Sequence, residues 1–182
     1  MRYVRDFAVT LLALGLLGAA GGVLWSLLAP RPPYAVTERG PVLADPSTQA
    51  LIAADGWFAV VTGGLGLVCG AAGYALSRRG RPLAVLLGLV VGGMAAAYLT
   101  LAVGGAVNPG AATVTASGQG VPLVPGPLKL TAYGVLVSWP VLAGGLFFTL
   151  EAVAGYRESP LRRPFGGQDA YGPLPDRELG GR

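Results

Sequence analysis

The chain has 182 residues, of which 53% are hydrophobic and only 12% are charged, with a formal net charge of +4. An average soluble domain carries roughly 25% charged residues, so this composition predicts a membrane protein. Because the sequence contains no His and one Cys, it excludes an intrachain disulfide, a Cys/His zinc site, and catalysis by a Ser–His–Asp or Cys–His set.

Four apolar stretches follow one another along the chain, and each is long enough to cross a bilayer as a helix, which takes roughly 20 residues. Glu151 is the only charged residue within them. Since the remaining segments are too short for a separate soluble domain, we predict one all-α domain over residues 1–156, a four-transmembrane-helix bundle. The predicted spans are 7–29, 57–76, 83–107 and 133–155.

The first stretch follows a basic N-terminal segment, as a secretory signal peptide does. Its apolar core of 23 residues exceeds the roughly 7–15 residues of a signal, and Leu27 stands where a cleavage site needs a small residue. We therefore predict that this segment is retained as a span.

The basic residues predict the orientation. Ten of the thirteen Lys and Arg residues precede span 1, join spans 2 and 3, or follow span 4, whereas Arg31, Arg39 and Lys129 fall on the other side. Under the positive-inside rule, both termini are cytoplasmic and loops 30–56 and 108–132 face outward from the cell membrane. Because the positive charges flank spans, they indicate contact with the lipid bilayer and no nucleic-acid partner.

Aromatic residues gather toward the outward ends of the spans. They are Trp25, Trp57, Trp139, Tyr34 and Tyr133. Amphipathic rings favour the headgroup layer, so this pattern predicts an outer aromatic belt; an aromatic ligand cage is the alternative.

Glycines at helical spacing mark the predicted packing faces of spans 1, 2 and 3. Small residues let helix backbones approach closely within lipid. We expect these faces to pack within one bundle, and homo-oligomerisation through a leftover face is the alternative. The helix-packing glycines are Gly15, Gly18, Gly22, Gly63, Gly66, Gly70, Gly73, Gly88 and Gly92.

Pro140 interrupts the fourth span. Proline removes a backbone donor and crowds the carbonyl four residues earlier, so we expect a kink near Leu136. Such a kink shapes a packed helix or serves as a gate.

The outer loops each read as short strands around a turn. In the first, strand-like segments 34–37 and 42–43 flank a turn, and in the second, segments 112–116 and 121–124 do so. Segment 52–56 also aligns with segment 130–134. We predict a parallel duplication of a helix–outer loop–helix unit, with two β-hairpins that pair into a small extracytoplasmic cap.

Segments 53–59 and 127–134, with the following Trp139-Pro140, resemble an uncharacterised actinobacterial family of four-span integral membrane proteins that carry a domain of unknown function. The resemblance covers roughly residues 7 to 155. It implies the same topology and a cell-membrane location, and it brings no catalytic or binding residues.

Two carboxylates are candidate functional residues. Glu151 lies near the inner end of span 4, where it either binds a proton or ion or forms an interfacial salt bridge with Arg5, Arg78 or Arg79. Asp55 precedes span 2, and its simplest role is to cap that helix; the alternative is a ligand site at the outer mouth.

The tail over 157–182 is rich in Pro and Gly, and we expect it to be disordered and cytoplasmic. With no catalytic constellation or cofactor motif, we expect a non-enzymatic structural or accessory component of cell-envelope machinery, with a membrane or envelope protein partner. The alternative is a small transporter, channel or lipid-binding membrane protein.

Overall fold

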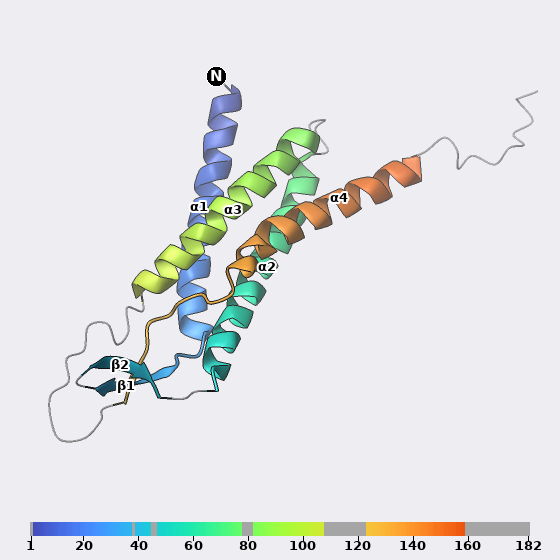
Figure 1. Ribbon diagram of the computed structural model, residues 1–182. Coiled ribbons are helices and arrows are strands. Elements are labelled where there is room, and N and C mark those ends of the chain that lie inside the picture. Colours follow the sequence, from blue (N-terminus) through green and yellow to red (C-terminus); the bar gives the residue numbers. More distant parts are fainter. Residues whose placement is uncertain (1, 38, 45–46, 78–81, 108–122, 159–182) are drawn as a thin grey trace, which may run out of the picture.

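The computed structural model describes residues 2–37, 39–44, 47–77, 82–107 and 123–158. Four long helices dominate these ranges (Figure 1): α1 (Arg2–Leu28), α2 (Gln49–Ser77), α3 (Pro82–Val107) and α4 (Ser138–Glu158). A short 3₁₀ helix, η2 (Tyr133–Val137), leads directly into α4. α1 packs chiefly on α3, and α2 packs chiefly on α4.

Three helical segments are long and apolar enough to cross a membrane, namely Gln49–Ser77, Pro82–Val107 and Tyr133–Arg157. The apolar part of α1, Leu12–Leu28, is shorter. The structure is therefore that of a mostly helical protein compatible with a membrane location. α2 begins eight positions before the predicted start of its span, because the Ala-rich sequence ahead of Trp57 also favours helix.

A small antiparallel sheet lies beyond the ends of α1 and α2 (Figure 1). It contains β1 (Pro33–Thr37), β2 (Gly40–Leu43) and β3 (Leu123–Pro125), in the order β2-β1-β3. Gly40 closes the β1–β2 turn at a φ of 111°, which favours glycine because it has no side chain to clash.

The two loops that were predicted to face outward therefore both contribute strands to one sheet. The first loop forms the predicted hairpin, and the second adds β3 to the free side of β1. The other strand predicted for the second loop, 112–116, lies outside the described residues. Segment 52–56 is helical whereas segment 130–134 is irregular, with a bend at Thr131, and then 3₁₀-helical, so the two aligned segments differ locally.

The interior of the bundle is built from small residues around a few large aromatic rings. Trp25 and Phe58 are fully buried and meet edge to face, with ring centroids 5.0 Å apart. Ala97 and Ala143 are also fully buried, because two backbones can approach closely only where side chains are small. Many large aliphatic side chains instead cover the outside of the helices, although a few, such as Leu14, Leu89 and Leu136, are buried.

Pro140 lies in the first turn of α4 and not in the middle of a long helix. The N–H that proline lacks would have bonded the carbonyl of Leu136, four residues earlier. The helical run is 3₁₀ up to Val137 and α-helical from Ser138, so its geometry changes at the place where this bond is missing. The helix thus changes type where a kink was expected.

The predicted disordered tail begins at residue 157, but α4 continues to Glu158. The rest of the tail, residues 159–182, lies outside the described residues.

Candidate functional site: polar contacts between the helices

Asp55 is buried and holds the segment that leads into η2 and α4. Its Oδ1 accepts the backbone N–H of Thr131 at 2.9 Å, and its Oδ2 accepts the N–H of Ala132 at 2.8 Å and the Thr131 hydroxyl. Asp55 was expected to cap its own helix, but α2 already begins at Gln49, so the N–H groups of that first turn lie further back. The carboxylate instead serves free N–H groups just before η2, at the positive end of another helical run.

Two hydroxyls meet where the middle of α2 contacts the first residue of α4. Thr62 Oγ1 lies 2.6 Å from Ser138 Oγ and also donates to the Phe58 carbonyl at 2.6 Å. Because a hydroxyl has one proton, Ser138 supplies the proton of the Thr62–Ser138 bond. Thr62 is fully buried, so both of its polar contacts are made inside the protein.

At the C-terminal end of α2, Ser77 bonds Glu151 of α4. The Ser77 hydroxyl lies 2.6 Å from Glu151 Oε1 and 3.0 Å from the Tyr74 carbonyl oxygen, so one proton is shared between two acceptors. Ser77 is buried and Glu151 half-buried. The alternative partners of Glu151, the side chains of Arg5, Arg78 and Arg79, are outside what the structure describes.

Hydrogen bonds also join α1 to its neighbours. Thr100 of α3 donates to the carbonyl oxygens of Gly18 and Ala96, each at 2.9 Å. The indole N–H of Trp25 donates to the Ala54 carbonyl at 2.9 Å, next to the Asp55 contact. These polar contacts thus link two helices of the bundle, or α2 to the segment that precedes η2.

The glycines predicted to pack helices lie at these same contacts. A Cβ on Gly18 would lie 2.7 Å from the Ala96 carbonyl oxygen, and one on Gly22 would lie 2.7 Å from the Thr100 carbonyl oxygen. On α2, Gly66 and Gly70 approach the backbone of α4 equally closely.

The other predicted glycines approach side chains or open space. A Cβ on Gly63, Gly73 or Gly92 would meet a leucine side chain at 2.4–2.9 Å, and one on Gly15 would only reach Leu99 at 4.0 Å. Gly88 has no such atom within 4 Å. Four of the nine glycines therefore sit against backbone that leaves no room for a methyl group, and at three more a leucine side chain would have to move.

The prediction of an outer aromatic belt is wrong for Trp25 and Trp139, which are fully buried. Trp57 and Tyr133 do lie on the protein surface, with 40% and 67% of their surface exposed. Position along a span places a ring at one depth, but the side of the helix decides whether the ring meets lipid or protein. The Trp139 indole N–H has no hydrogen-bond partner of good geometry among the described residues, although its side chain interacts with the Cys69 thiol.

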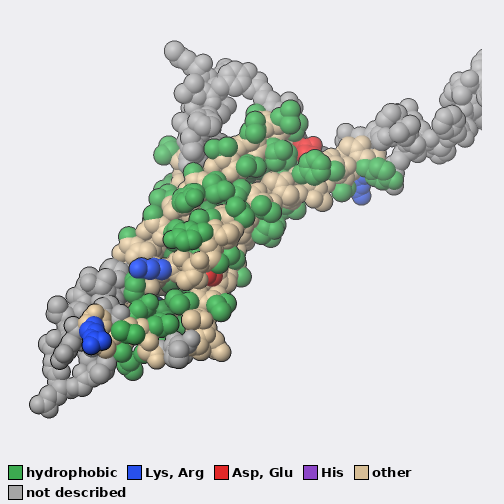
Figure 2. Space-filling model, viewed as in Figure 1, with side chains coloured by type: hydrophobic (Ala, Val, Ile, Leu, Met, Phe, Trp, Pro, Cys, Tyr) green, Lys and Arg blue, Asp and Glu red, His purple; other side chains and the backbone are tan. Residues whose placement is uncertain are grey.

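The two candidate carboxylates lie too far apart to act on one molecule. Asp55 and Ser77, the partner of Glu151, are separated by 22 positions of α2, which is about 33 Å of helix. No group of three or more His, Cys, Asp or Glu side chains comes together in the described part of the chain. Figure 2 shows hydrophobic side chains along the visible face of the helices and basic ones at its two ends.

Sequence reasoning identified Asp55 and Glu151 but not their partners. Thr131 and Ser77 carry no sequence signal for those contacts, because each partner comes from a distant helix or loop. A period of seven links Asp55, Thr62 and Cys69 along one side of α2, and this spacing would have indicated a shared polar face.

No family model, curated protein sequence or solved structure matches this chain, so the resemblance to a four-span family stays a prediction.

Proposed function

We propose that the chain is a four-span integral membrane protein of the cell membrane with both termini in the cytoplasm. The placement of Arg31, Arg39 and Lys129 at or near the sheet supports this orientation, since the other ten basic residues fall at the opposite ends of the spans in the sequence. The apolar part of α1, Leu12–Leu28, is short for a span, and we take residues 7–11 before it as part of the same span.

Within that topology, we propose a non-enzymatic accessory role in cell-envelope machinery. One observation carries this proposal: the described hydroxyl and carboxylate groups inside the bundle bond one another or the backbone. Thr62, Ser77 and Thr100 are buried and bonded across helices, and Asp55 accepts three hydrogen bonds. Groups used in this way rigidify a scaffold and are not left to bind a polar substrate.

The same contacts weigh against a small transporter for polar solutes. A transport path needs polar groups that face a cavity and change partners. Here the mid-bundle hydroxyls of Thr62 and Ser138 bond each other, and glycines draw the backbones around them together. A lipid substrate needs no such lining, so lipid handling is the outcome that would replace the accessory role.

We also propose that the chain arose by duplication, with α1 equivalent to α3. Gly18 faces Ala96 and Gly22 faces Thr100, and both pairs are 78 positions apart. The loop alignment of Ile52 with Leu130 has the same offset. When two related halves are arranged about a two-fold axis, a residue near that axis contacts the equivalent residue of the other half. The shared offset of 78 positions therefore supports two related halves. The α2–α4 contacts do not share it.

The test of the accessory role is purification from the native host in nanodiscs or mild detergent, followed by mass spectrometry of proteins and lipids. We expect a stoichiometric protein partner that is lost when the outer loops are replaced. A lone protein that carries one enriched lipid or small molecule would instead establish lipid handling or transport.

A further inference from the structure

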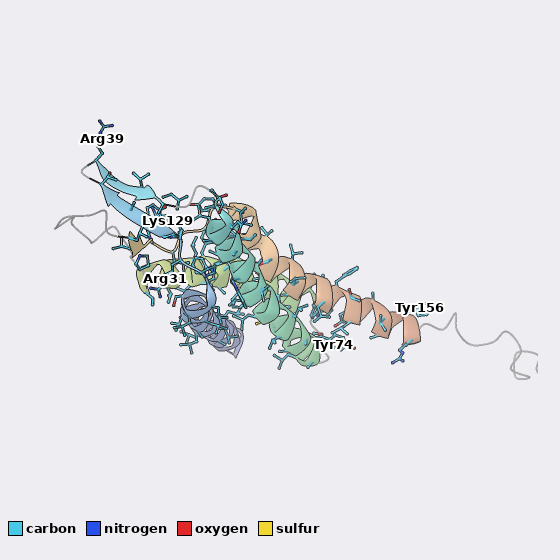
Figure 3. The ribbon with its side chains drawn as sticks, turned by 90° about the horizontal axis from the view of Figure 1, so that it is seen from below. Arg31, Arg39, Tyr74, Lys129 and Tyr156 are labelled. Carbon is cyan, nitrogen blue, oxygen red and sulfur yellow. The ribbon has the colours of Figure 1, made fainter. Side chains whose placement is uncertain are left out.

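The contact between Ser77 and Glu151 has more acceptors than protons if the carboxyl group is ionised. It lies at the end of the bundle away from the sheet: Figure 3 places Tyr74 near the far end of α2 and Arg39 at the tip of the hairpin. The Ser77 hydroxyl is 2.6 Å from Glu151 Oε1 and 3.0 Å from the Tyr74 carbonyl oxygen. A carbonyl oxygen and a carboxylate only accept, so the single Ser77 proton would have to serve both of them.

The bond to the Tyr74 carbonyl is the one that the helix itself favours. A serine or threonine in a helix places its hydroxyl beside the carbonyl three or four residues earlier and donates to that oxygen. The other helical hydroxyls of the bundle do so in Ser26, Thr62, Thr100 and Thr149. If Ser77 follows the same rule, its proton is already used. The proton of the 2.6 Å bond then has to come from Glu151.

The surroundings of Glu151 favour an uncharged group. Its carboxyl is half-buried, and no ion pair joins it to a basic side chain in the part of the chain that the structure describes. The described titratable side chains nearest to it along α2 and α4 include Tyr74 and Arg157, and the first two turns of α3 contain none. Arg157 is six positions further along α4, so it lies on another side of that helix. A carboxyl group in apolar surroundings without a cation takes up a proton in place of a buried charge.

We propose that Glu151 is a proton-binding site, which holds one proton as a neutral carboxylic acid in the folded bundle. Its O–H donates to the Ser77 hydroxyl, and that hydroxyl donates to the Tyr74 carbonyl, so each pair of oxygens has one proton between them. This chain of hydrogen bonds joins α4 to the last turn of α2 and leaves no charge within the apolar layer. The inference goes beyond the accessory role and does not depend on it.

The test is infrared difference spectroscopy of the full-length protein in lipid at neutral pH. The C=O stretch of a protonated carboxyl group is separate from the carboxylate and amide bands. We expect Glu151→Gln to lose one such carboxylic-acid band per chain, and this band should shift in D₂O in the parent protein. Asp55→Asn is the matched control. Because Asp55 accepts three hydrogen bonds, its variant should lose a carboxylate band and no carboxylic-acid band.

Ser77→Ala tests the direction of the hydrogen bond, and it provides a second measurement if Glu151→Gln fails to fold. It removes the acceptor of the Glu151 proton, so the carboxylic-acid band should remain and move to higher frequency. A band that Ser77→Ala leaves in place would overturn the hydrogen-bond chain.

Two results would overturn the proton site itself. Loss of a carboxylate band in Glu151→Gln would show that Glu151 is ionised. A Glu151 carboxylate band that moves when Na⁺ is exchanged for K⁺ would assign the site to a metal cation instead of a proton.

Discussion

Gly70 offers the sharpest test of how the bundle is held together. A Cβ at this position would lie 2.5 Å from the Ala143 carbonyl oxygen and 3.1 Å from the Ala143 Cα. Both atoms belong to the backbone of α4, which cannot turn aside as a flexible side chain can. Gly70→Ala therefore forces α2 and α4 apart. Gly64→Ala is the matched control, because Gly64 lies on the same helix, is exposed, and has no such atom within 4 Å.

The magnitude follows from the distances. Ordinary contact begins at 3.4 Å, so the added methyl group requires a separation of about 0.9 Å. A gap of 0.5–1 Å forfeits roughly a quarter to a half of the dispersion energy of each contact it opens, and overpacking of this kind costs about 1–3 kcal/mol. Replacing glycine by alanine inside a helix itself contributes about 0.5–1 kcal/mol of stability. We expect Gly64→Ala to gain that amount, and Gly70→Ala to be less stable than Gly64→Ala by about 1–3 kcal/mol.

The assay is reversible unfolding of both variants in the same mixed micelles or bicelles, with the free energy of unfolding measured against the parent protein. Helix propensity cancels between the two variants, so their difference reports the α2–α4 contact alone. If Gly70→Ala matches Gly64→Ala, the two backbones do not meet at Ala143, and the helix pairing described here is refuted.

Further predictions concern the polar contacts and the buried rings. Asp55→Asn replaces one acceptor oxygen by an NH₂ group that faces donors. We expect the free energy of unfolding to fall by about 1–3 kcal/mol and hydrogen exchange at the Thr131 and Ala132 amides to become faster. Unchanged exchange would show that Asp55 does not anchor that segment. Glu151→Gln brings an N–H that can donate to Ser77, so its free energy of unfolding should match or exceed that of the parent protein. Glu151→Ala should lose about 1–3 kcal/mol of that free energy. Equal losses in both variants would show that the carboxylate charge is required. Brominated lipids should quench the fluorescence of Trp57 and leave that of Trp25 nearly untouched when each is the sole Trp, and the reverse order would contradict the burial of Trp25.

The helices themselves are predictable from the sequence. Long apolar runs such as 83–107 contain few polar side chains, and in lipid their backbone polar groups must be satisfied within the segment, which makes helix the favoured structure. The predicted range 83–107 and α3, Pro82–Val107, differ by one residue. Hydropathy reports the depth of a residue but not the side of the helix that faces a neighbour, which is why Trp25 and Trp139 were assigned to the wrong environment.

The helix partners could not be read from the sequence. In lipid, burial of apolar surface does not favour one pairing over another, so the choice depends on shape and on a few hydrogen bonds. Gly66 and Gly70 indicate a packing face, but only the tertiary structure places Trp139 and Ala143 against them. Glycine spacing thus predicts that a contact exists, and the complementary backbone decides with which helix.

Asp55, in the candidate site, shows the same difference between what the sequence predicts and what the tertiary structure decides. The sequence determined that a carboxylate stands next to a predicted span, where an unpaired charge would be costly. The tertiary structure decided that its partners are Thr131 and Ala132, more than seventy positions away. Composition and hydropathy predict the membrane class and the helices, because both depend on each segment's own transfer into lipid. The pairing of helices, the shared sheet and the partners of each polar group depend on contacts between distant segments, and only the folded chain contains them.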